Sequence, residues 1–342
     1  MIGWPEPMKI KDIGEFGLID LLARQVPAPS DRVVKGIGDD TAVIRPEQGK
    51  LVLMTTDMII EDVHFSLRYT PLRAVGWKAL AVNISDIAAM GGTPAYAVVA
   101  VGIPPNMEAG MIEELYSGLG ECARIYQTDI VGGDTVRSPG GLIINVALSG
   151  WVEPNRVVYR SGACPGDIFM VSGPLGTSAA GLYALNSSCP VVTCDAADEV
   201  IQAHLRPWAR VKEGLVLGRS GYVTSMNDIS DGLASEVLEI CRSSGTGCEL
   251  YADSIPYTGA VAEICRGIGV PPLEWALYGG EDYELVFTVK PEGADVVKAA
   301  LHEAGCSPEI VGKVVLPDEG CIIVENHRRM ALTPGGYDHF RE

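Results

Sequence analysis

The chain has 342 residues, a length that favours two domains of ordinary size. Hydrophobic residues make up 47% of it and aromatic residues 6%, enough to build a large core. Its 26 basic and 44 acidic side chains give a net charge of −18, so we expect no binding to nucleic acid or to an anionic membrane. If such a chain handles phosphates, metal ions are the obvious source of the positive charge that it needs.

Membrane-spanning and secreted classes are not expected either. No run reaches the 18 apolar residues of a transmembrane helix, and Met1 to Lys11 lack the apolar stretch of a signal peptide. The nine cysteines are scattered, with no C-x-x-C pair. Cys189 and Cys194 are close in sequence, but no second pair of ligands completes a zinc site with them. We therefore expect reduced thiols, mostly buried, in a cytoplasmic protein.

The first half of the chain alternates strand-like and helix-like segments. Apolar runs predict strands at residues 51–54, 95–101, 129–131 and 142–152. One helix is predicted from Pro71 to the Gly91-Gly92 stop, and a second over residues 107–125, capped by Asn106. The polar, turn-rich residues 154–165 mark the predicted boundary between domains at 10–153 and 154–340.

The second half continues the alternation. Strands are predicted at residues 168–171, 222–226 and 283–289, with helices at 177–185, 208–217, 232–243 and 295–304. Residues 186–195 are predicted to be an irregular linker. Gly132-Gly133-Asp134 and Gly279-Gly280-Glu281-Asp282 form a coarse echo between the halves, which suggests two related domains. The whole pattern predicts a mixed α/β fold.

Aspartates fall at the ends of the predicted strands, beside small residues. Asp40, Asp57 and Asp134 follow such strands or glycine-rich turns, Asp228 and Asp231 bracket Ser230, and Asp86 lies late in a helix. Carboxylates at the ligand-binding ends of strands are suitable ligands for Mg²⁺. Any one of them is also typical of a turn or a helix cap, as Asp231 before Gly232 illustrates. Spacing alone does not decide between these two interpretations.

Several nucleotide-binding and hydrolase signatures are absent. The sequence has no G-x-x-x-x-G-K-[ST] loop, no H-R-D or D-F-G kinase motif and no G-x-S-x-G elbow. Residues 173–178 open a predicted helix and could hold a phosphate through backbone N–H groups, but they contain no lysine. An ordinary strand-to-helix turn explains that loop equally well.

Taken together, the motifs resemble one family over nearly the whole chain, in order. The chain is similar to the thiamine-monophosphate kinases, which belong to a larger group with aminoimidazole ribonucleotide synthetase and selenophosphate synthetase. The matching strings are Gly14-Glu15-Phe16, Gly36-Ile37-Gly38-Asp39-Asp40, Thr55-Thr56-Asp57, Val63-His64-Phe65, Asn83-Ile84-Ser85-Asp86, Gly132-Gly133-Asp134-Thr135, Arg160-Ser161-Gly162-Ala163, Asp228-Ile229-Ser230-Asp231-Gly232, Gly279-Gly280-Glu281-Asp282-Tyr283 and Gly336-Tyr337-Asp338.

The resemblance implies a fold and a set of site residues. The implied fold is a two-domain, mixed α+β architecture of the PurM-like type, in which the N-terminal domains pair across a homodimer. Implied partners are thiamine monophosphate and ATP as co-substrate, with several Mg²⁺ ions. Catalysis is assigned by position to Asp57, Asp134 and Asp228. Metal binding is assigned to Asp40, Thr55, Thr56, Asp57, Asp86, Asp134, Asp228 and Asp231, ATP binding to Tyr116, Gly133, Asp134, Arg160 and Ser230, and thiamine phosphate binding to His64, Glu281 and Tyr337.

The implied reaction is the ATP-dependent phosphorylation of thiamine monophosphate to thiamine diphosphate. The acceptor phosphate is mostly dianionic at pH 7, so direct transfer needs neither a general base nor a phosphorylated residue. Repulsion between polyanions is then the main barrier, and metal ions shared by Asp57 and Asp134 would offset it. Two alternatives stay open: another ATP-using member of the same group, and a non-catalytic protein that binds nucleotide or divalent metal.

Overall fold

The computed structural model describes residues 21–22, 24–35, 43–44, 46–186 and 194–336. The chain divides into two compact units, which we call the first and the second domain. The first comprises residues 1–84 and 94–151, and the second comprises residues 85–93 and 152–342. Each domain has its own β-sheet.

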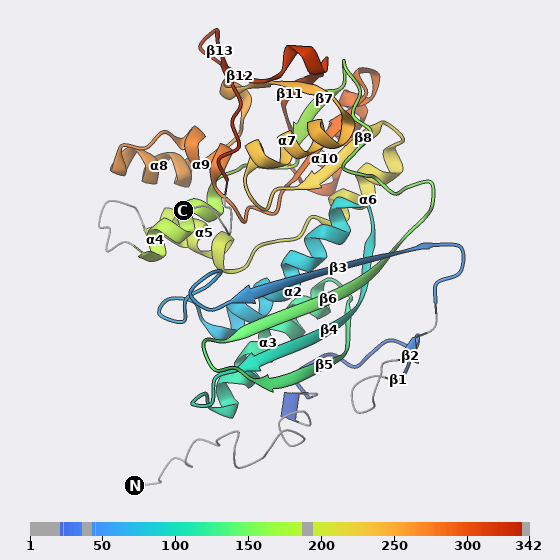
Figure 1. The fold of residues 1–342 in the computed structure, drawn as a ribbon, viewed down its shortest axis with the longest axis vertical. Helices are drawn as coiled ribbons and strands as arrows, with labels where there is room; N and C mark the ends of the chain where they lie inside the picture. Colours follow the sequence, from blue (N-terminus) through green and yellow to red (C-terminus); the bar gives the residue numbers. More distant parts are fainter. Residues whose placement is uncertain (1–20, 23, 36–42, 45, 187–193, 337–342) are drawn as a thin grey trace. The chain divides into compact units, whose positions relative to one another are not determined.

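The first domain is a four-stranded sheet with helices on one face (Figure 1). Its strands lie in the order β3-β6-β4-β5, with β4 and β5 parallel. Strand β6 alternates buried and half-buried residues along its length, as expected when one face of a sheet is covered. A separate two-stranded ribbon joins β1 and β2. The elements are β1 (Val33–Lys35), β2 (Val43–Ile44), β3 (Leu51–Ile60), α2 (Leu72–Ala89), β4 (Thr93–Ile103), α3 (Ala109–Ile125), β5 (Asp129–Arg137) and β6 (Ile143–Val152).

Helices α2 and α3 touch backbone to backbone at two glycines. A Cβ atom on Gly76 would lie 1.9 Å from the carbonyl oxygen of Leu115, and one on Gly118 would lie 1.9 Å from that of Arg73. Since real Cβ atoms never come so close, only glycine allows this helix spacing at either position. The fixed spacing in turn holds Asn83 of α2 where its side-chain oxygen accepts a hydrogen bond from the amide of Asp57, at 3.0 Å.

The second domain is a seven-stranded sheet in the order β13-β12-β9-β11-β7-β10-β8. All of its strand pairs are antiparallel except β12 with β9, which run parallel. The strands are β7 (Ile168–Val171), β8 (Val223–Asp228), β9 (Gly247–Tyr251), β10 (Leu285–Val289), β11 (Glu309–Val315), β12 (Cys321–Glu325) and β13 (Arg328–Ala331).

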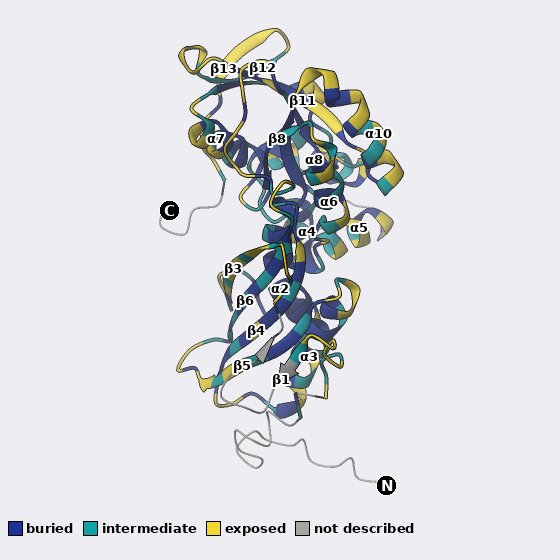
Figure 2. Cartoon of the chain, turned by 90° about the vertical axis from the view of Figure 1, so that its right-hand side faces the viewer, coloured by how far each residue is buried: buried dark blue, intermediate teal, exposed yellow. Residues whose placement is uncertain are grey.

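This sheet is covered on both faces at its centre, because strands β7 and β10 are apolar on both sides. Phe169 and Val171 pack with α7 and α9, whereas Met170 and Phe287 pack with α6 and α10. Figure 2 shows the strands around β8 largely in the colour of buried residues, whereas β13 has the colour of exposed residues. The helices of the two faces are α7 (Leu233–Ser244), α9 (Pro272–Tyr278), α6 (Val211–Ser220) and α10 (Ala294–Ala304).

A third apolar cluster joins α4 (Thr177–Asn186), α5 (Cys194–Leu205) and α8 (Gly259–Ile268) around Val200 and Val261. Short 3₁₀ turns complete the domain at Ala252–Ser254, Pro291–Gly293 and Pro317–Glu319. At one edge of the sheet, Asn326 (φ 48°) and His327 (φ 64°) form a two-residue hairpin turn between β12 and β13. Two positive φ angles in succession are typical of the type I′ turn that matches strand twist.

The mixed α/β fold that the sequence predicts is confirmed, whereas several predicted boundaries are wrong. Strand β3 continues to Ile60, so Thr55, Thr56 and Asp57 lie inside a strand and not after one; Asp134 likewise lies inside β5. Helix α3 begins at Ala109 after Glu108, not after Asn106. The predicted linker 186–195 overlaps the start of α5, and the glycine echo has no structural counterpart, since residues 279–282 form a loop. In the described segments, no helix is both long and apolar enough for a membrane span.

Candidate active site

Two predicted motifs of the second domain meet at the end of β8. Strand β8 ends at Asp228, and Ser230 and Asp231 follow before α7 begins. The backbone N–H of Glu281 donates to the carbonyl oxygen of Ser230 at 2.7 Å, and that of Tyr283 donates to Ile229 at 2.9 Å. The loop after β8 and the loop before β10 are therefore joined by backbone hydrogen bonds, although about 50 residues separate them in the sequence.

Glycines make this close contact between the loops possible. Gly232 has a φ of 99°, and a Cβ atom there would lie 2.7 Å from the carbonyl oxygen of Leu277. A Cβ atom on Gly280 would lie 2.8 Å from that of Ser230. In the partner loop, Glu281 (φ 67°) and Tyr283 (φ 51°) adopt left-handed conformations that non-glycine residues seldom take. Strain of this kind concentrates at functional sites.

Asp228 is a buried carboxylate that receives a short hydrogen bond. The hydroxyl of Ser85 in α2 donates to its Oδ2 atom at 2.6 Å, and both residues belong to the second domain. Ser85 precedes Asp86, which is half-buried. The structure thus places Asp228 in contact with the residue that precedes the predicted metal ligand Asp86.

Glu236 of α7 is a buried residue of this cluster that the sequence did not reveal. It accepts hydrogen bonds from the side chain of Asn227, from the Ser230 hydroxyl at 3.3 Å and from the Asp231 amide at 3.2 Å. Burial, followed by the charge of Asp228, raises the pKa of Glu236 to about 8. In the sequence, the feature that could have pointed to Glu236 is its place as an acidic residue in the first turn of α7. Glu236 holds the loop between Asp228 and Gly232 in place.

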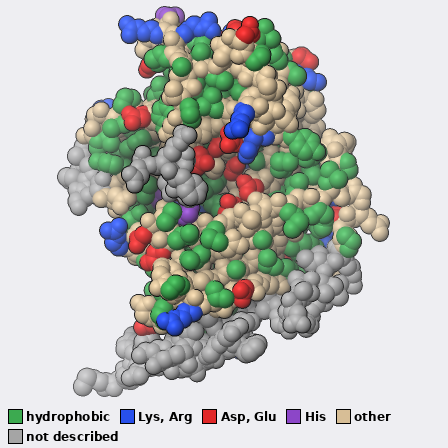
Figure 3. Space-filling model, in the orientation of Figure 1, with side chains coloured by type: hydrophobic (Ala, Val, Ile, Leu, Met, Phe, Trp, Pro, Cys, Tyr) green, Lys and Arg blue, Asp and Glu red, His purple; other side chains and the backbone are tan. Residues whose placement is uncertain are grey.

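Arg160 extends the same cluster toward solvent. Its guanidinium donates to the Asn227 side-chain oxygen at 3.2 Å and pairs with Glu239 at 2.8 Å. Arg160 and Ser230, both predicted to bind ATP, are therefore linked through Asn227 and Glu236. Figure 3 shows several acidic side chains grouped on the face in view, with basic ones beside them.

A pocket of about 180 Å³ lies beside this cluster, within the second domain. Glu281 lines it, as do Trp208 and two basic residues, Arg206 and Arg210. The buried His204 lies 3.3 Å from the Glu281 carboxylate, and its Nδ1 atom is 2.9 Å from the hydroxyl of Ser178. Sequence patterns did not single out His204 or Trp208. The remaining lining residues are Pro174, Thr177, Ser178, Ala203, Pro207, Thr258, Asp282 and Glu284.

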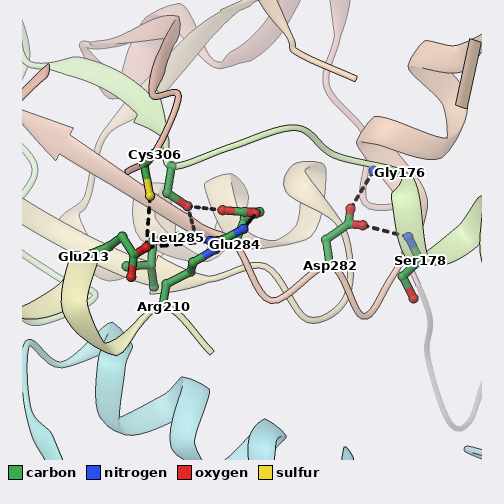
Figure 4. A network of polar contacts seen from close by, with 9 residues as sticks. Gly176, Ser178, Arg210, Glu213, Asp282, Glu284, Leu285 and Cys306 are labelled. Atoms are coloured by element: carbon green, nitrogen blue, oxygen red, sulfur yellow. Dashed lines mark hydrogen bonds and ion pairs between the residues drawn. The ribbon is translucent and has the colours of Figure 1, made fainter. Parts of the chain in front are cut away.

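A polar network forms the wall of the pocket (Figure 4). Buried Glu284 accepts from Arg210 and from the hydroxyl of Ser172, which itself accepts from the Leu285 amide at 2.8 Å. Burial would lower the pKa of Arg210, but the charge and hydrogen bond of Glu284, together with the charges of Glu213 and Cys306, outweigh it and raise the pKa. Arg210 also approaches Glu213, which accepts a hydrogen bond from the thiol of Cys306 at 3.0 Å. Arg210 is thus a permanent cation at the edge of the pocket.

Asp282 closes the other end of this wall, at the start of α4. Its carboxylate accepts from the amides of Gly176 at 2.6 Å and Ser178 at 3.0 Å (Figure 4). Burial raises the pKa of Asp282 to about 7, against the effect of these hydrogen bonds. The loop at residues 173–178, which the sequence offered as a phosphate cradle, therefore uses two of its N–H groups to bind a carboxylate of the same chain.

The predicted residues of the first domain lie on its sheet. Thr55 and Asp57 share one face of β3, and Thr56 is on the other, where its hydroxyl donates to Val146 at 3.0 Å. Asp134 is exposed on β5, beside Gly133, whose Cβ would clash with the Val99 carbonyl. Since β3 and β5 are opposite edges of the sheet, about 14 Å of sheet separates them. Asp57 and Asp134 remain predicted metal ligands, but this separation is too large for both to bind one ion within a chain.

Four other residues were predicted to bind substrate, ATP or metal. Tyr116 is buried in α3, where burial raises its pKa to about 12, a setting that gives no support to contact with ATP. His64 is half-buried, and its Nδ1 accepts from the Ile60 amide at 3.1 Å, which leaves the proton on Nε2. Asp40 and Tyr337 lie outside the described residues.

Comparison with known proteins decides the family. Residues 38–152 match the model for "AIR synthase related protein, N-terminal domain", and residues 164–324 match that for the C-terminal domain. The thiamine-monophosphate kinase of Bacillus subtilis is 37% identical over 332 residues, 96% of this chain and 99% of that protein. The chain belongs to the thiamine-monophosphate kinase family.

Solved structures of the family support the assignment. A thiamine-monophosphate kinase from Stenotrophomonas maltophilia is 30% identical, with a TM-score of 0.80 over 91% of this chain and 96% of that one. The structure of AaThiL complexed with AMPPCP and TMP is 34% identical, with a TM-score of 0.75 over 98% of this chain and all of that one. The family and the two-domain fold inferred from the sequence motifs are therefore confirmed.

Proposed function

We propose that this chain phosphorylates thiamine monophosphate with ATP to give thiamine diphosphate, by direct in-line transfer. The 2.7 Å hydrogen bond from Glu281 to Ser230 is the observation that carries the proposal. It fixes the loop assigned to the acceptor against the loop assigned to metal and ATP, so that the two reactants bind side by side. The family supplies independent support, since a relative has been solved with AMPPCP and TMP.

The pocket suits the chemistry of the acceptor. Thiamine carries a positively charged thiazolium ring, and the pocket offers the carboxylate of Glu281 and the exposed indole of Trp208 to such a ring. Arg206 and Arg210 lie in the same wall, where they would attract the phosphate end of the molecule. His204 and Ser178 hold the Glu281 side chain from behind, so that its carboxylate is oriented before the substrate arrives.

The loop after β8 has the ligand chemistry that Mg²⁺ requires. Asp228 is buried near a second acidic group, Glu236, and its charge contributes to the raised pKa of that group. A cation bound at Asp228 would favour the ionised form of both carboxyl groups. We therefore assign Mg²⁺ binding in the second domain to Asp86, Asp228 and Asp231. In the first domain we assign it to Thr55, Thr56, Asp57 and Asp134.

Bound Mg²⁺ would neutralise the charge on the transferred phosphoryl group and on the leaving oxygen of ADP. The residues of the chain have the remaining tasks. Arg160 and Ser230 would hold ATP, and Glu281 would hold the acceptor so that its phosphate oxygen faces the γ-phosphorus. A new P–O bond then forms as the bond to the β–γ bridging oxygen breaks, and ADP leaves. No side chain needs to accept a proton, because the acceptor is already a dianion.

We further propose that the enzyme is a cytoplasmic homodimer joined through the first domain. The β3 face opposite to Asp57 exposes large apolar side chains: Val52 is 55% exposed, Met54 82% and Met58 50%. Val98 of β4 and Val136 of β5 are exposed as well. Large apolar side chains exposed along one sheet mark an interaction site. A second copy of the same sheet would cover it.

An assay for thiamine diphosphate tests the proposed function. The full chain with Mg²⁺, ATP and thiamine monophosphate should form one thiamine diphosphate for each ADP released. With chiral γ-phosphate, the configuration at phosphorus should invert, and rapid quenching should trap no phosphorylated protein. Turnover of an aminoimidazole precursor in place of thiamine monophosphate would favour another ATP-using member of the group, and absence of ADP release would favour a binding protein.

A further inference from the structure

Three cysteines of the second domain form a cluster that the proposed reaction does not use. Cys241 lies in the last turns of α7, Cys248 near the start of β9 and Cys321 at the start of β12. Their sulfur atoms all lie within 4.8 Å of one another. No other group of three or more possible metal ligands from His, Cys, Asp and Glu is this close in the parts of the chain that the structure describes.

The backbone holds the three thiols together. Gly245 (φ 67°) ends α7, and the amide of Thr246 donates to the Cys241 carbonyl at 3.0 Å, so the chain turns directly into β9. Cys248 and Cys321 are register partners on the parallel strands β9 and β12. The Cys248 amide also donates to Gly320 at 3.1 Å. Because the contacts belong to main-chain structure, the cluster forms whenever this domain folds.

The spacing fits a single metal ion. Three thiolates around one ion at the Zn–S distance of about 2.3 Å are separated by about 4 Å, which is within the observed limit. Soft thiolate ligands select Zn²⁺ and Cu(I) over the hard cations that oxygen ligands prefer. The cluster therefore differs in chemistry from the carboxylates assigned to Mg²⁺.

The surroundings provide both reactivity and access. Cys241 and Cys248 are buried, whereas Cys321 is partly exposed. Hydrogen bonds from Cys241, and then from Cys248, lower the pKa of the Cys321 thiol, while the pKa of Cys248 is raised by its thiol neighbours and by burial. Cys321 is therefore the thiol of the cluster that solvent reaches first. A thiolate, not a thiol, is the form that binds metal.

We propose that Cys241, Cys248 and Cys321 bind one thiophilic metal ion of the zinc class, with water as the fourth ligand on the exposed side of Cys321. Three metal–sulfur bonds form, and each thiol releases its proton to solvent. The ion would join α7, β9 and β12. It would stabilise the domain in proportion to the logarithm of metal concentration over the dissociation constant.

Cobalt titration tests the site by a signal that carboxylates cannot give. The experiment uses the untagged full chain, in which Cys189 and Cys194 are replaced by serine so that this other pair of thiols cannot bind the ion. The protein is reduced, freed of metal and titrated with Co²⁺ in the absence of oxygen. We expect a sulfur-to-cobalt charge-transfer band that saturates at one ion per chain and is lost when Zn²⁺ is added. Zn²⁺ should also raise the melting temperature in the absence of nucleotide.

Single substitutions give the controls. Cys321→Ala, the least buried of the three, should weaken Co²⁺ binding by about 100-fold or more, and Cys241→Ala and Cys248→Ala should do the same. Cys265→Ala, which removes a buried thiol of α8 outside the cluster, should leave binding unchanged. Circular dichroism checks that each variant is folded. No charge-transfer band in the folded parent, an equal band in Cys321→Ala, or a disulfide within the cluster in the reduced preparation would each overturn the proposal.

Discussion

The two segments assigned to metal binding are built in opposite ways. In the second domain, the loop from Asp228 to Gly232 is surrounded by its own chain: Ser85 donates to Asp228, and Glu236 accepts from Ser230 and Asp231. In the first domain, Thr55 to Asp57 lie within an edge strand whose outer face is exposed. One segment is surrounded within a single chain, whereas the other lies in a strand with one uncovered face, on which Thr56 is found but Thr55 and Asp57 are not.

The difference separates preorganisation from assembly. A buried carboxylate that already has its hydrogen bonds needs no rearrangement to receive a cation, and charge stabilisation of this type is a large term in catalysis. An edge strand can complete its environment only when another surface covers it. We therefore expect substitutions in the loop to act on chemistry directly, and substitutions on the β3 face to act through association.

The largest effect is expected from Asp228→Asn, which keeps size and deletes charge. Since the carboxylate would hold a cation at the transferred phosphoryl group, kcat should fall by about 100- to 1000-fold. Steady-state assays at saturating Mg²⁺ measure kcat. Asp318→Asn, at an exposed carboxylate of a 3₁₀ turn, is the matched control and should be near normal. Equal activity in both variants would remove Asp228 from the mechanism.

On the β3 face, Met54→Lys should weaken the homodimer. Two copies of the charge would be buried in a symmetric interface, in place of two apolar side chains worth about 2 kcal/mol each, so the dissociation constant should rise about 100-fold or more. Sedimentation velocity over a range of concentrations gives this constant. Met330→Lys in β13, also an exposed strand methionine, should not change it. If Met54→Lys stays as dimeric as the parent, the dimer uses another surface.

A smaller effect is expected at the junction of the two loops. Glu281→Gln keeps the backbone hydrogen bond to Ser230 but deletes the negative charge in the pocket, so KM for thiamine monophosphate should rise about tenfold. The Mg²⁺ dependence should stay as in the parent. Initial rates measured at varied thiamine monophosphate and at varied Mg²⁺ distinguish the effect on KM from an effect on the Mg²⁺ dependence. A shifted Mg²⁺ dependence with unchanged KM would reassign Glu281 to the metal.

The smallest effect concerns stability and pH. Because the pKa of Asp282 is raised to about 7, its contribution to stability is complete below its unfolded pKa of about 4 and is lost as pH rises through 7. The carboxyl is half-buried, so the loss should be about 1 kcal/mol. Urea unfolding of the metal-free chain at pH 5 and pH 8 measures it. In Asp282→Asn, the difference in the free energy of unfolding between pH 5 and pH 8 should be smaller than in the parent. If the two differences are equal, other groups cause the pH dependence.

Local patterns predicted what depends on neighbours in sequence. The strand at residues 168–171 is confirmed as β7, and the motif strings by themselves were enough to identify the family. The boundary of β3 was missed because Thr-Thr-Asp resembles the end of a strand, while the strand continues through it on tertiary contacts such as that between Asp57 and Asn83. Polar residues that form a ligand site inside a strand cannot be distinguished in the sequence from polar residues that form a turn.

Long-range partners were beyond such patterns. Glu236, His204 and Trp208 lie in ordinary helical or loop sequence, and only the folded chain places them beside Asp228 or Glu281. The thiol cluster makes the same point, since proximity in sequence favours the pair Cys189 and Cys194 instead. Cys248 lies next to Cys321 because of the register between β9 and β12, and sequence spacing does not predict that register.

The β12–β13 hairpin has a consequence for solubility. Strand β13 is the outer edge of the seven-stranded sheet, all four of its residues are exposed, and two of them are Arg328 and Arg329. An open edge invites another strand to add to it and so begins aggregation. Short length and adjacent positive charges oppose that addition, because a second β13 would bring like charges together. The hairpin thus protects the large sheet from growing beyond its last strand.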